Sequence, residues 1–126
     1  NSFAGKNLKN ALHGSLKRLK TDYIDLYQLH WPNRGSYHFR QNWAYNPSNQ
    51  NTKKIKQDIF DILNFLSKKV KEGKIRNIGL SNETAWGTMQ FIKIANENMD
   101  LQTPLKNLKI RDLVVKNLKN MQLSLV

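Results

Sequence analysis

Residues 21–32 read TDYIDLYQLHWP, a short and largely apolar run that ends on a histidine, a tryptophan and a proline. Apolar runs of roughly four to eight residues that are closed by helix-breaking residues are typical of strands buried in a parallel sheet. In α/β enzymes the residues that carry the chemistry sit at the carboxyl ends of such strands. His30 holds that position, so it is the first candidate for a functional residue.

Helical and strand patterns alternate on both sides of this run. Apolar spacing predicts helices over residues 6–20, 55–71 and 85–98. It predicts strands over residues 23–29 and 75–80. The order helix, strand, helix, strand, helix predicts an α/β fold with parallel strands joined by right-handed crossovers.

Local signals predict where these elements end. Gly73 is a candidate left-handed stop for the second helix. Ser81 and Asn82 are predicted to act as strand exit and helix cap together, with Glu83 in the first helical turn. Five residues of the third helix are predicted to face the core: Ala85, Trp86, Met89, Ile92 and Ala95.

Two segments fall outside this alternation. Residues 31–53 form a connection longer than most loops, and its Trp43 and Tyr45 are predicted to shape a lid. Residues 102–126 carry leucines at helical spacing and predict a basic amphipathic helix, which either covers apolar surface or contacts a membrane surface or an acidic partner. We therefore divide the chain into residues 1–101 and a divergent basic tail, residues 102–126.

The composition narrows the functional classes. The 126 residues carry a net charge of +12 and contain no cysteine, which excludes disulfides and thiolate metal sites and fits a cytoplasmic protein. No apolar run approaches the about 18 residues of a membrane span. The basic residues are spread over nearly every segment and no nucleic-acid-binding motif is visible, so solvated faces are favoured over nucleic-acid binding. Nucleic-acid binding through the basic tail stays as a rival hypothesis.

Two separate motifs resemble one known family. NALHGSLKRLKTDYIDLYQLHWP, residues 10–32, looks like the third helix and fourth strand of an aldo-keto reductase, and GKIRNIGLSN, residues 73–82, resembles the fifth strand and its exit. The continuation ETAWGTM and the pair Asn33-Arg34 are most similar to the Tas-type, NADP(H)-dependent branch of that superfamily. The resemblance covers about residues 7–101. After Leu101 neither the family's sixth strand nor its phosphate-binding region is recognisable.

The resemblance implies a partial (β/α)8 TIM barrel, because a complete barrel needs about 250 residues. The family's catalytic set contains an aspartate, a tyrosine, a lysine and a histidine, and His30 matches the histidine. The other three belong to family segments that precede the matched region. We therefore expect a central fragment of an NADPH-dependent aldo-keto reductase, inactive alone. The alternative is a non-enzymatic half-barrel that associates with itself or another chain through its open edges.

The resemblance also assigns roles to four residues. In the family, hydride passes from NADPH to the carbonyl carbon of an aldehyde or ketone, and His30 would donate a hydrogen bond to the carbonyl oxygen. Ser81 and Asn82 resemble the pair that holds the nicotinamide carboxamide, since a hydroxyl and an amide can bond both its C=O and its NH2. Trp31 would line the substrate pocket. No cluster of His, Asp or Glu has metal-ligand spacing.

Each assignment has a structural alternative. His30 could be a satisfied histidine in a pocket wall, and Trp31 an ordinary core aromatic. Ser81 or Asn82 could serve only as a helix cap, a role that contributes about 1 kcal/mol. Capping and cofactor contact are compatible, because one residue can cap while its neighbour binds.

Overall fold

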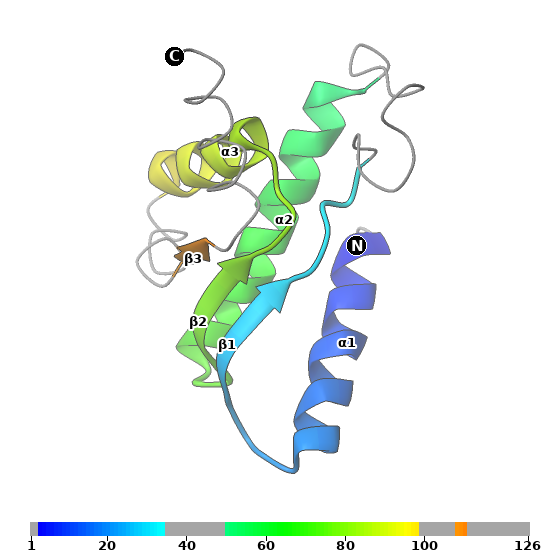
Figure 1. The fold of residues 1–126 in the computed structure, drawn as a ribbon, viewed down its shortest axis with the longest axis vertical. Coiled ribbons are helices and arrows are strands. Elements are labelled where there is room, and N and C mark those ends of the chain that lie inside the picture. Colours follow the sequence, from blue (N-terminus) through cyan, green and yellow to red (C-terminus); the bar gives the residue numbers. More distant parts are fainter. Residues whose placement is uncertain (1–2, 35–49, 99–107, 111–126) are drawn as a thin grey trace, which may run out of the picture.

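The computed structural model describes residues 3–34, 50–98 and 108–110 (Figure 1). These residues form α1 (Phe3–Leu19), β1 (Ile24–Leu29), α2 (Thr52–Lys71), β2 (Ile75–Leu80), α3 (Ala85–Glu97) and β3 (Leu108–Ile110). The predicted order of the first five elements is confirmed, with bounds that shift by a few residues. The predicted lid residues Trp43 and Tyr45 lie outside the described residues, as does the tail apart from β3.

The strands form one parallel sheet in the order β1-β2-β3. β1 pairs with β2 from Ile24 opposite Ile75 to Leu29 opposite Leu80, which confirms the predicted parallel pair. β3 runs parallel to β2 on its other side. Its three residues fall where leucine spacing predicts a helix, so at these positions that prediction is wrong. Pairing with β2 overrides the local pattern, as tertiary context often does.

Both long helices pack on the same face of the sheet, and α2 lies behind the strands in Figure 1. Leu12 of α1 and Leu66 of α2 are buried together with Ile75 and Ile78 of β2. Doubly wound sheets carry helices on both faces, whereas a barrel wall carries them only outside. The arrangement is therefore that of a barrel wall. On the other face of β1, Leu26 stays 44% exposed within the described structure.

A second buried cluster joins α2, β2 and α3. Its buried members are Ile55, Ile59, Leu63, Leu80, Phe91, Ile94 and Ala95. Leu29 and Ile62 pack against both clusters, so the core is continuous from α1 to α3. Burial of each such large side chain stabilises the fold by about 1.5–3 kcal/mol.

The face of α3 differs from the predicted one. Ala95 is fully buried as predicted, but Trp86 and Met89 are 42% and 58% exposed, so those two predictions are wrong. Thr88 and Phe91 take the inward positions instead. The buried face of α3 is therefore rotated around the helix axis relative to the predicted face. The predicted residues did not all lie on one face of the helix.

Specific residues cap the helices and set where α2 and α3 begin and end. Asn51 caps α2, since its side chain accepts a hydrogen bond from the backbone N–H of Lys54 at 3.0 Å. Gly73 has φ 74°, which confirms the predicted left-handed stop. α3 is capped by Thr84, whose Oγ1 accepts from Gly87 N at 3.0 Å. The predicted Ser81-Asn82 cap is therefore wrong: this pair lies one step earlier, in the link between β2 and α3.

Candidate active site

Parallel pairing brings the residues that follow β1 and β2 to the same edge of the sheet. The last pair is Leu29 opposite Leu80, and the backbone N–H of Ser81 donates to the Leu29 carbonyl at 2.9 Å. The Gln28 side chain donates to the Leu80 carbonyl at 3.3 Å. His30 and Ser81 therefore emerge side by side at the ends of the two predicted parallel strands.

Asn82 links the two strand ends. Its Nδ2 donates to the backbone carbonyl of His30 at 2.8 Å and to Ser81 Oγ at 3.2 Å. The backbone of Asn82 has φ 56°, in the left-handed region that asparagine tolerates better than most residues. Three of the four predicted site residues thus form one contiguous group at the carboxyl edge of the sheet.

The bond from Asn82 engages the backbone of His30 and leaves its imidazole available. The His30 side chain is exposed, and its ring centroid lies 5.7 Å from that of Trp31 with the planes tilted by 49°. Within the described part of the chain, neither imidazole nitrogen has a hydrogen-bond partner. One nitrogen can therefore donate to a ligand while the other accepts.

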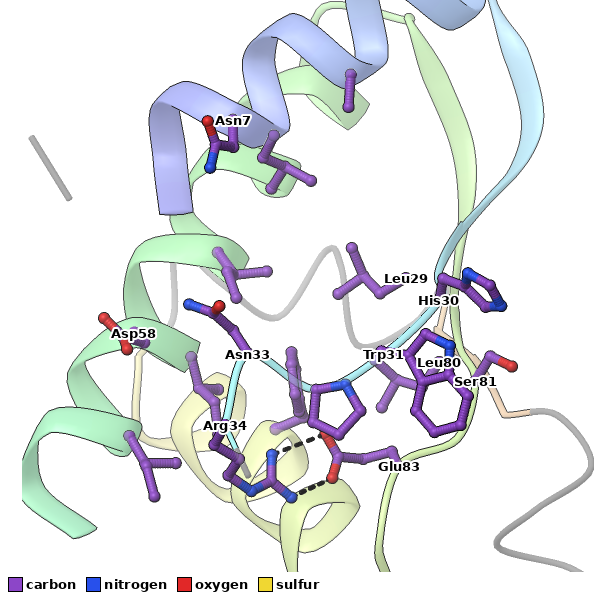
Figure 2. Close-up of a pocket in the computed structure, with 17 residues that line it drawn as sticks. Asn7, Leu29, His30, Trp31, Asn33, Arg34, Asp58, Leu80, Ser81 and Glu83 are labelled. Atoms are coloured by element: carbon purple, nitrogen blue, oxygen red, sulfur yellow. Dashed lines mark hydrogen bonds and ion pairs between the residues drawn. The ribbon is translucent and has the colours of Figure 1, made fainter. Parts of the chain in front are cut away.

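A cavity of about 300 Å³ lies between α1, α2 and the ends of β1 and β2. Leu29, His30 and Ser81 all border this cavity. Figure 2 shows Leu29 pointing into it, whereas the His30 ring and the Ser81 hydroxyl point away, to the other side of the strands. Successive residues of a strand face opposite sides of its sheet, which accounts for the difference. Half-buried Trp31 borders the cavity. A carbonyl in contact with the His30 ring would lie on the open face of the sheet instead.

A buried ion pair that the sequence did not reveal lies at this edge. Arg34, which follows β1, and Glu83, which precedes α3, form a two-pronged pair with Nη1 to Oε2 at 3.1 Å and Nη2 to Oε1 (Figure 2). The side chains are 9% and 4% exposed. The available signal was that opposite charges follow the ends of two strands predicted to be neighbours.

The same carboxylate shapes the start of α3. Glu83 Oε1 accepts from the backbone N–H of Thr84 at 2.8 Å, and Arg34 Nη2 donates to Thr84 Oγ1 at 3.1 Å. A Cβ on Gly87 would overlap the Glu83 carboxylate and the Arg34 guanidinium. Glycine at this helical position is therefore explained by the close approach of the ion pair.

Two described groups with displaced pKa values lie away from this edge. Burial raises the pKa of the Tyr27 hydroxyl above its usual value of 10.0. A hydrogen bond from Lys69 is the main cause that lowers the pKa of the Glu72 carboxyl, at the opposite end of the strands. Neither group belongs to the candidate site.

The described ranges contain no group of three or more His, Cys, Asp or Glu side chains placed to hold a metal ion. No helix among α1, α2 and α3 combines the length and apolar character needed to cross a membrane.

The chain matches one known protein family. The model of the Aldo/keto reductase family matches residues 2–122, a range that includes most of the tail set apart by sequence analysis. The division of the chain near residue 101 itself stays a prediction.

Individual relatives match over shorter ranges. Protein tas of Escherichia coli (strain K12) is 43% identical over 94 residues, which cover 74% of this chain and 26% of that protein. An aldo-keto reductase of Babesia bovis is 44% identical over 98 residues, 72% of this chain and 33% of that protein. The chain thus spans about a quarter to a third of these relatives. A solved structure, the glycerol dehydrogenase AKR11B4 from Gluconobacter oxydans, aligns with a TM-score of 0.48 and 24% identity over 71% of this chain and 21% of that chain.

Proposed function

The chain belongs to the aldo/keto reductase family, and we propose that it forms part of the active site of an NADPH-dependent reductase that converts aldehydes or ketones to alcohols. The observation that carries the proposal is the 2.8 Å bond from Asn82 Nδ2 to the carbonyl of His30. It joins the proposed cofactor-binding pair to the proposed catalytic histidine, although 52 residues separate them in the sequence.

His30 serves in this proposal as the hydrogen-bond donor to the substrate carbonyl oxygen. A donor placed where negative charge develops lowers the barrier, because it stabilises the transition state more than the ground state. The exposed imidazole at the end of a parallel strand suits this role, since its nitrogens are not engaged by other described residues. Trp31, whose ring centroid lies 5.7 Å from that of His30, would border the bound carbonyl compound.

Ser81 and Asn82 fit a primary carboxamide such as that of nicotinamide. Both Nδ2 bonds of Asn82 are directed to His30 and Ser81, so its Oδ1 is left to accept from an amide NH2. Ser81 Oγ accepts from Asn82, which leaves the hydroxyl hydrogen to donate to an amide C=O. Bound NADPH would supply the hydride. The two side chains would hold its nicotinamide ring near the His30 edge.

A binding measurement on this chain tests the proposal. We expect NADPH fluorescence to report saturable binding, and Ser81→Ala and Asn82→Asp each to weaken it about tenfold, the equivalent of one lost hydrogen bond. Asn77→Asp is the matched control, because Asn77 Nδ2 makes the same kind of bond to the Asp25 carbonyl, away from the site. Absence of binding, or equal losses in Asn82→Asp and Asn77→Asp, would contradict the proposal.

Turnover gives a second test. In any preparation that reduces an aldehyde with NADPH, we expect His30→Ala to lower kcat by roughly 10²–10⁴-fold, the usual contribution of one positioned proton-transfer or hydrogen-bonding group. Unchanged turnover after that substitution would remove His30 from the mechanism.

An association function is favoured by one specific observation. β1 ends the sheet order, and within the described residues its outer edge has no strand partner, while Leu26 is 44% exposed. Such edges and apolar faces promote pairing between chains. We propose, as the second candidate, that the chain associates with itself or another chain there. Sedimentation should show self-association lost in Leu26→Lys and kept in Leu19→Lys, a control on α1 that is 64% exposed. A monodisperse native monomer would count against self-association.

A further inference from the structure

The buried ion pair between Arg34 and Glu83 takes no direct part in the proposed chemistry. Its two parallel bonds hold the guanidinium in one plane with the carboxylate. The guanidinium also donates to Thr84 Oγ1 at 3.1 Å and lies 5.4 Å from the ring centroid of Trp86. Each of these contacts thus crosses from the segment after β1 to the start of α3.

Stability alone does not account for such a pair. A buried ion pair gains little over apolar residues of the same volume, because the cost of removing two charges from water offsets their attraction. The exposed pair of Arg76 and Asp25, with an N–O distance of 3.0 Å and side chains 59% and 72% exposed, carries no such cost. The buried pair differs in what it fixes: a planar, two-pronged contact permits one relative position of two segments.

The segments that it fixes are those of the proposed site. Arg34 lies in the segment that follows His30, and Glu83 directly follows Asn82. The ion pair and the Asn82–His30 bond are therefore two neighbouring ties between the same two strand exits. We propose that the Arg34–Glu83 pair is a positioning element, which fixes the segment after β1 against the start of α3 and so holds the Asn82 amide on the His30 carbonyl. Its catalytic meaning rests on the proposed function, whereas the geometry does not.

Removal of the guanidinium has a defined consequence. The Glu83 carboxylate would be left buried without its cationic partner, and it would move toward water. Because Glu83 Oε1 also bonds Thr84 N, this movement would release the first turn of α3 and the left-handed link at Asn82. The Asn82 Oδ1 proposed to face a carboxamide would then no longer be held in place.

The experiment compares Arg34→Met and Arg34→Lys with Arg76→Met in the full 126-residue chain. Arg76 is the matched control, because it also pairs with a carboxylate and lies over an aromatic ring, 4.1 Å from the Tyr23 centroid. The readouts are the NMR shift of the Asn82 side-chain amide, hydrogen exchange at Thr84, Gly87 and the β1–β2 ladder, and NADPH affinity.

In Arg34→Met we expect a displaced Asn82 amide signal and about tenfold faster exchange at Thr84 and Gly87, with the ladder unchanged. NADPH affinity should fall about tenfold, while Arg76→Met changes none of these readouts. Arg34→Lys keeps the positive charge but loses the two-pronged contact with Glu83, so its effects should be intermediate. If Arg34→Met does not fold, the Arg34→Lys results decide whether the pair positions Asn82.

Three results would overturn the proposal. The first is an Asn82 amide signal at its native position in both Arg34 variants. The second is hydrogen exchange that rises as much in the β1–β2 ladder as at Thr84 and Gly87. The third is an unchanged NADPH affinity in both Arg34 variants, provided that the native chain binds NADPH. A native chain that binds no NADPH would instead refute the proposed function, and the NMR and exchange readouts would still decide the positioning role.

Discussion

The side-chain amide of Asn82 donates a 2.8 Å hydrogen bond to the backbone carbonyl of His30, from a residue whose own φ is 56°. The left-handed backbone turns the Asn82 side chain back toward β1. The bond therefore joins the segments that follow β1 and β2, directly after the last paired residues of the two strands. The strength of this link is open to direct measurement.

Replacement of Asn82 separates the cost of the bond from the cost of the backbone. Asn82→Gly loses the bond, about 1 kcal/mol, but adopts positive φ freely. Asn82→Ala loses the bond and also meets the left-handed penalty of about 1–2 kcal/mol. We expect urea denaturation to show Asn82→Ala less stable than Asn82→Gly by about 1 kcal/mol. Equal free energies of unfolding would show that φ at Asn82 is not constrained.

Two helical glycines should respond oppositely to alanine. Gly87→Ala places a Cβ inside the Arg34–Glu83 contact, and we expect a loss of about 1–3 kcal/mol in the free energy of unfolding. At Gly14 a Cβ would meet only the flexible end of Arg18, at 3.0 Å. There the better helix propensity of alanine should stabilise the chain by about 0.5–1 kcal/mol. A stabilising Gly87→Ala would contradict the packing at the start of α3.

We expect Tyr27 to make the folded chain less stable at alkaline pH. Burial raises the pKa of its hydroxyl in the folded chain above the usual 10.0. From about pH 10 upward the unfolded chain loses this proton first, so the folded state loses stability as pH rises. Tyr27→Phe should reduce this decline in denaturation midpoints measured on both sides of pH 10. Tyr23→Phe is the control, because Tyr23 is 40% exposed; identical curves for both variants would show that Tyr27 is not the cause.

Leucine truncations should map the core. Leu66 is 0% exposed and Leu19 is 64% exposed. We expect Leu66→Ala to lower the free energy of unfolding by about 2–5 kcal/mol, and Leu19→Ala by less than about 0.5 kcal/mol. Chemical denaturation measures both. Similar losses would mean that the α1–α2–β2 cluster is not the stabilising core.

The sequence was a good guide where local pattern and strand topology agree. The apolar runs that end at Leu29 and Leu80 are short and closed by breakers, so the strands, and the meeting of His30 with Ser81 and Asn82, were predictable from parallel pairing alone. Gly73 was equally predictable, because a left-handed stop strongly favours glycine.

The remaining features depend on contacts distant in the sequence. Arg34 and Glu83 are 49 residues apart and meet only once the strands pair. The orientation of α3, with Trp86 near Arg34 instead of in the core, follows from the Thr84 cap and that contact. β3 forms on the edge that β2 offers, against its own leucine spacing. The predicted roles of His30, Trp31, Ser81 and Asn82 stay predictions.

The buried core and the proposed site residues lie on opposite faces of this sheet. Leu12, Leu66, Ile75 and Ile78 pack α1 and α2 against β2 on the helix side. The side chains of His30 and Ser81 project from the other side (Figure 2). Substitutions on the face that carries the proposed site residues can therefore be made without opening this core. The strand exits are the exception, because Asn82 there bonds the His30 carbonyl and Glu83 ties the start of α3 to Arg34.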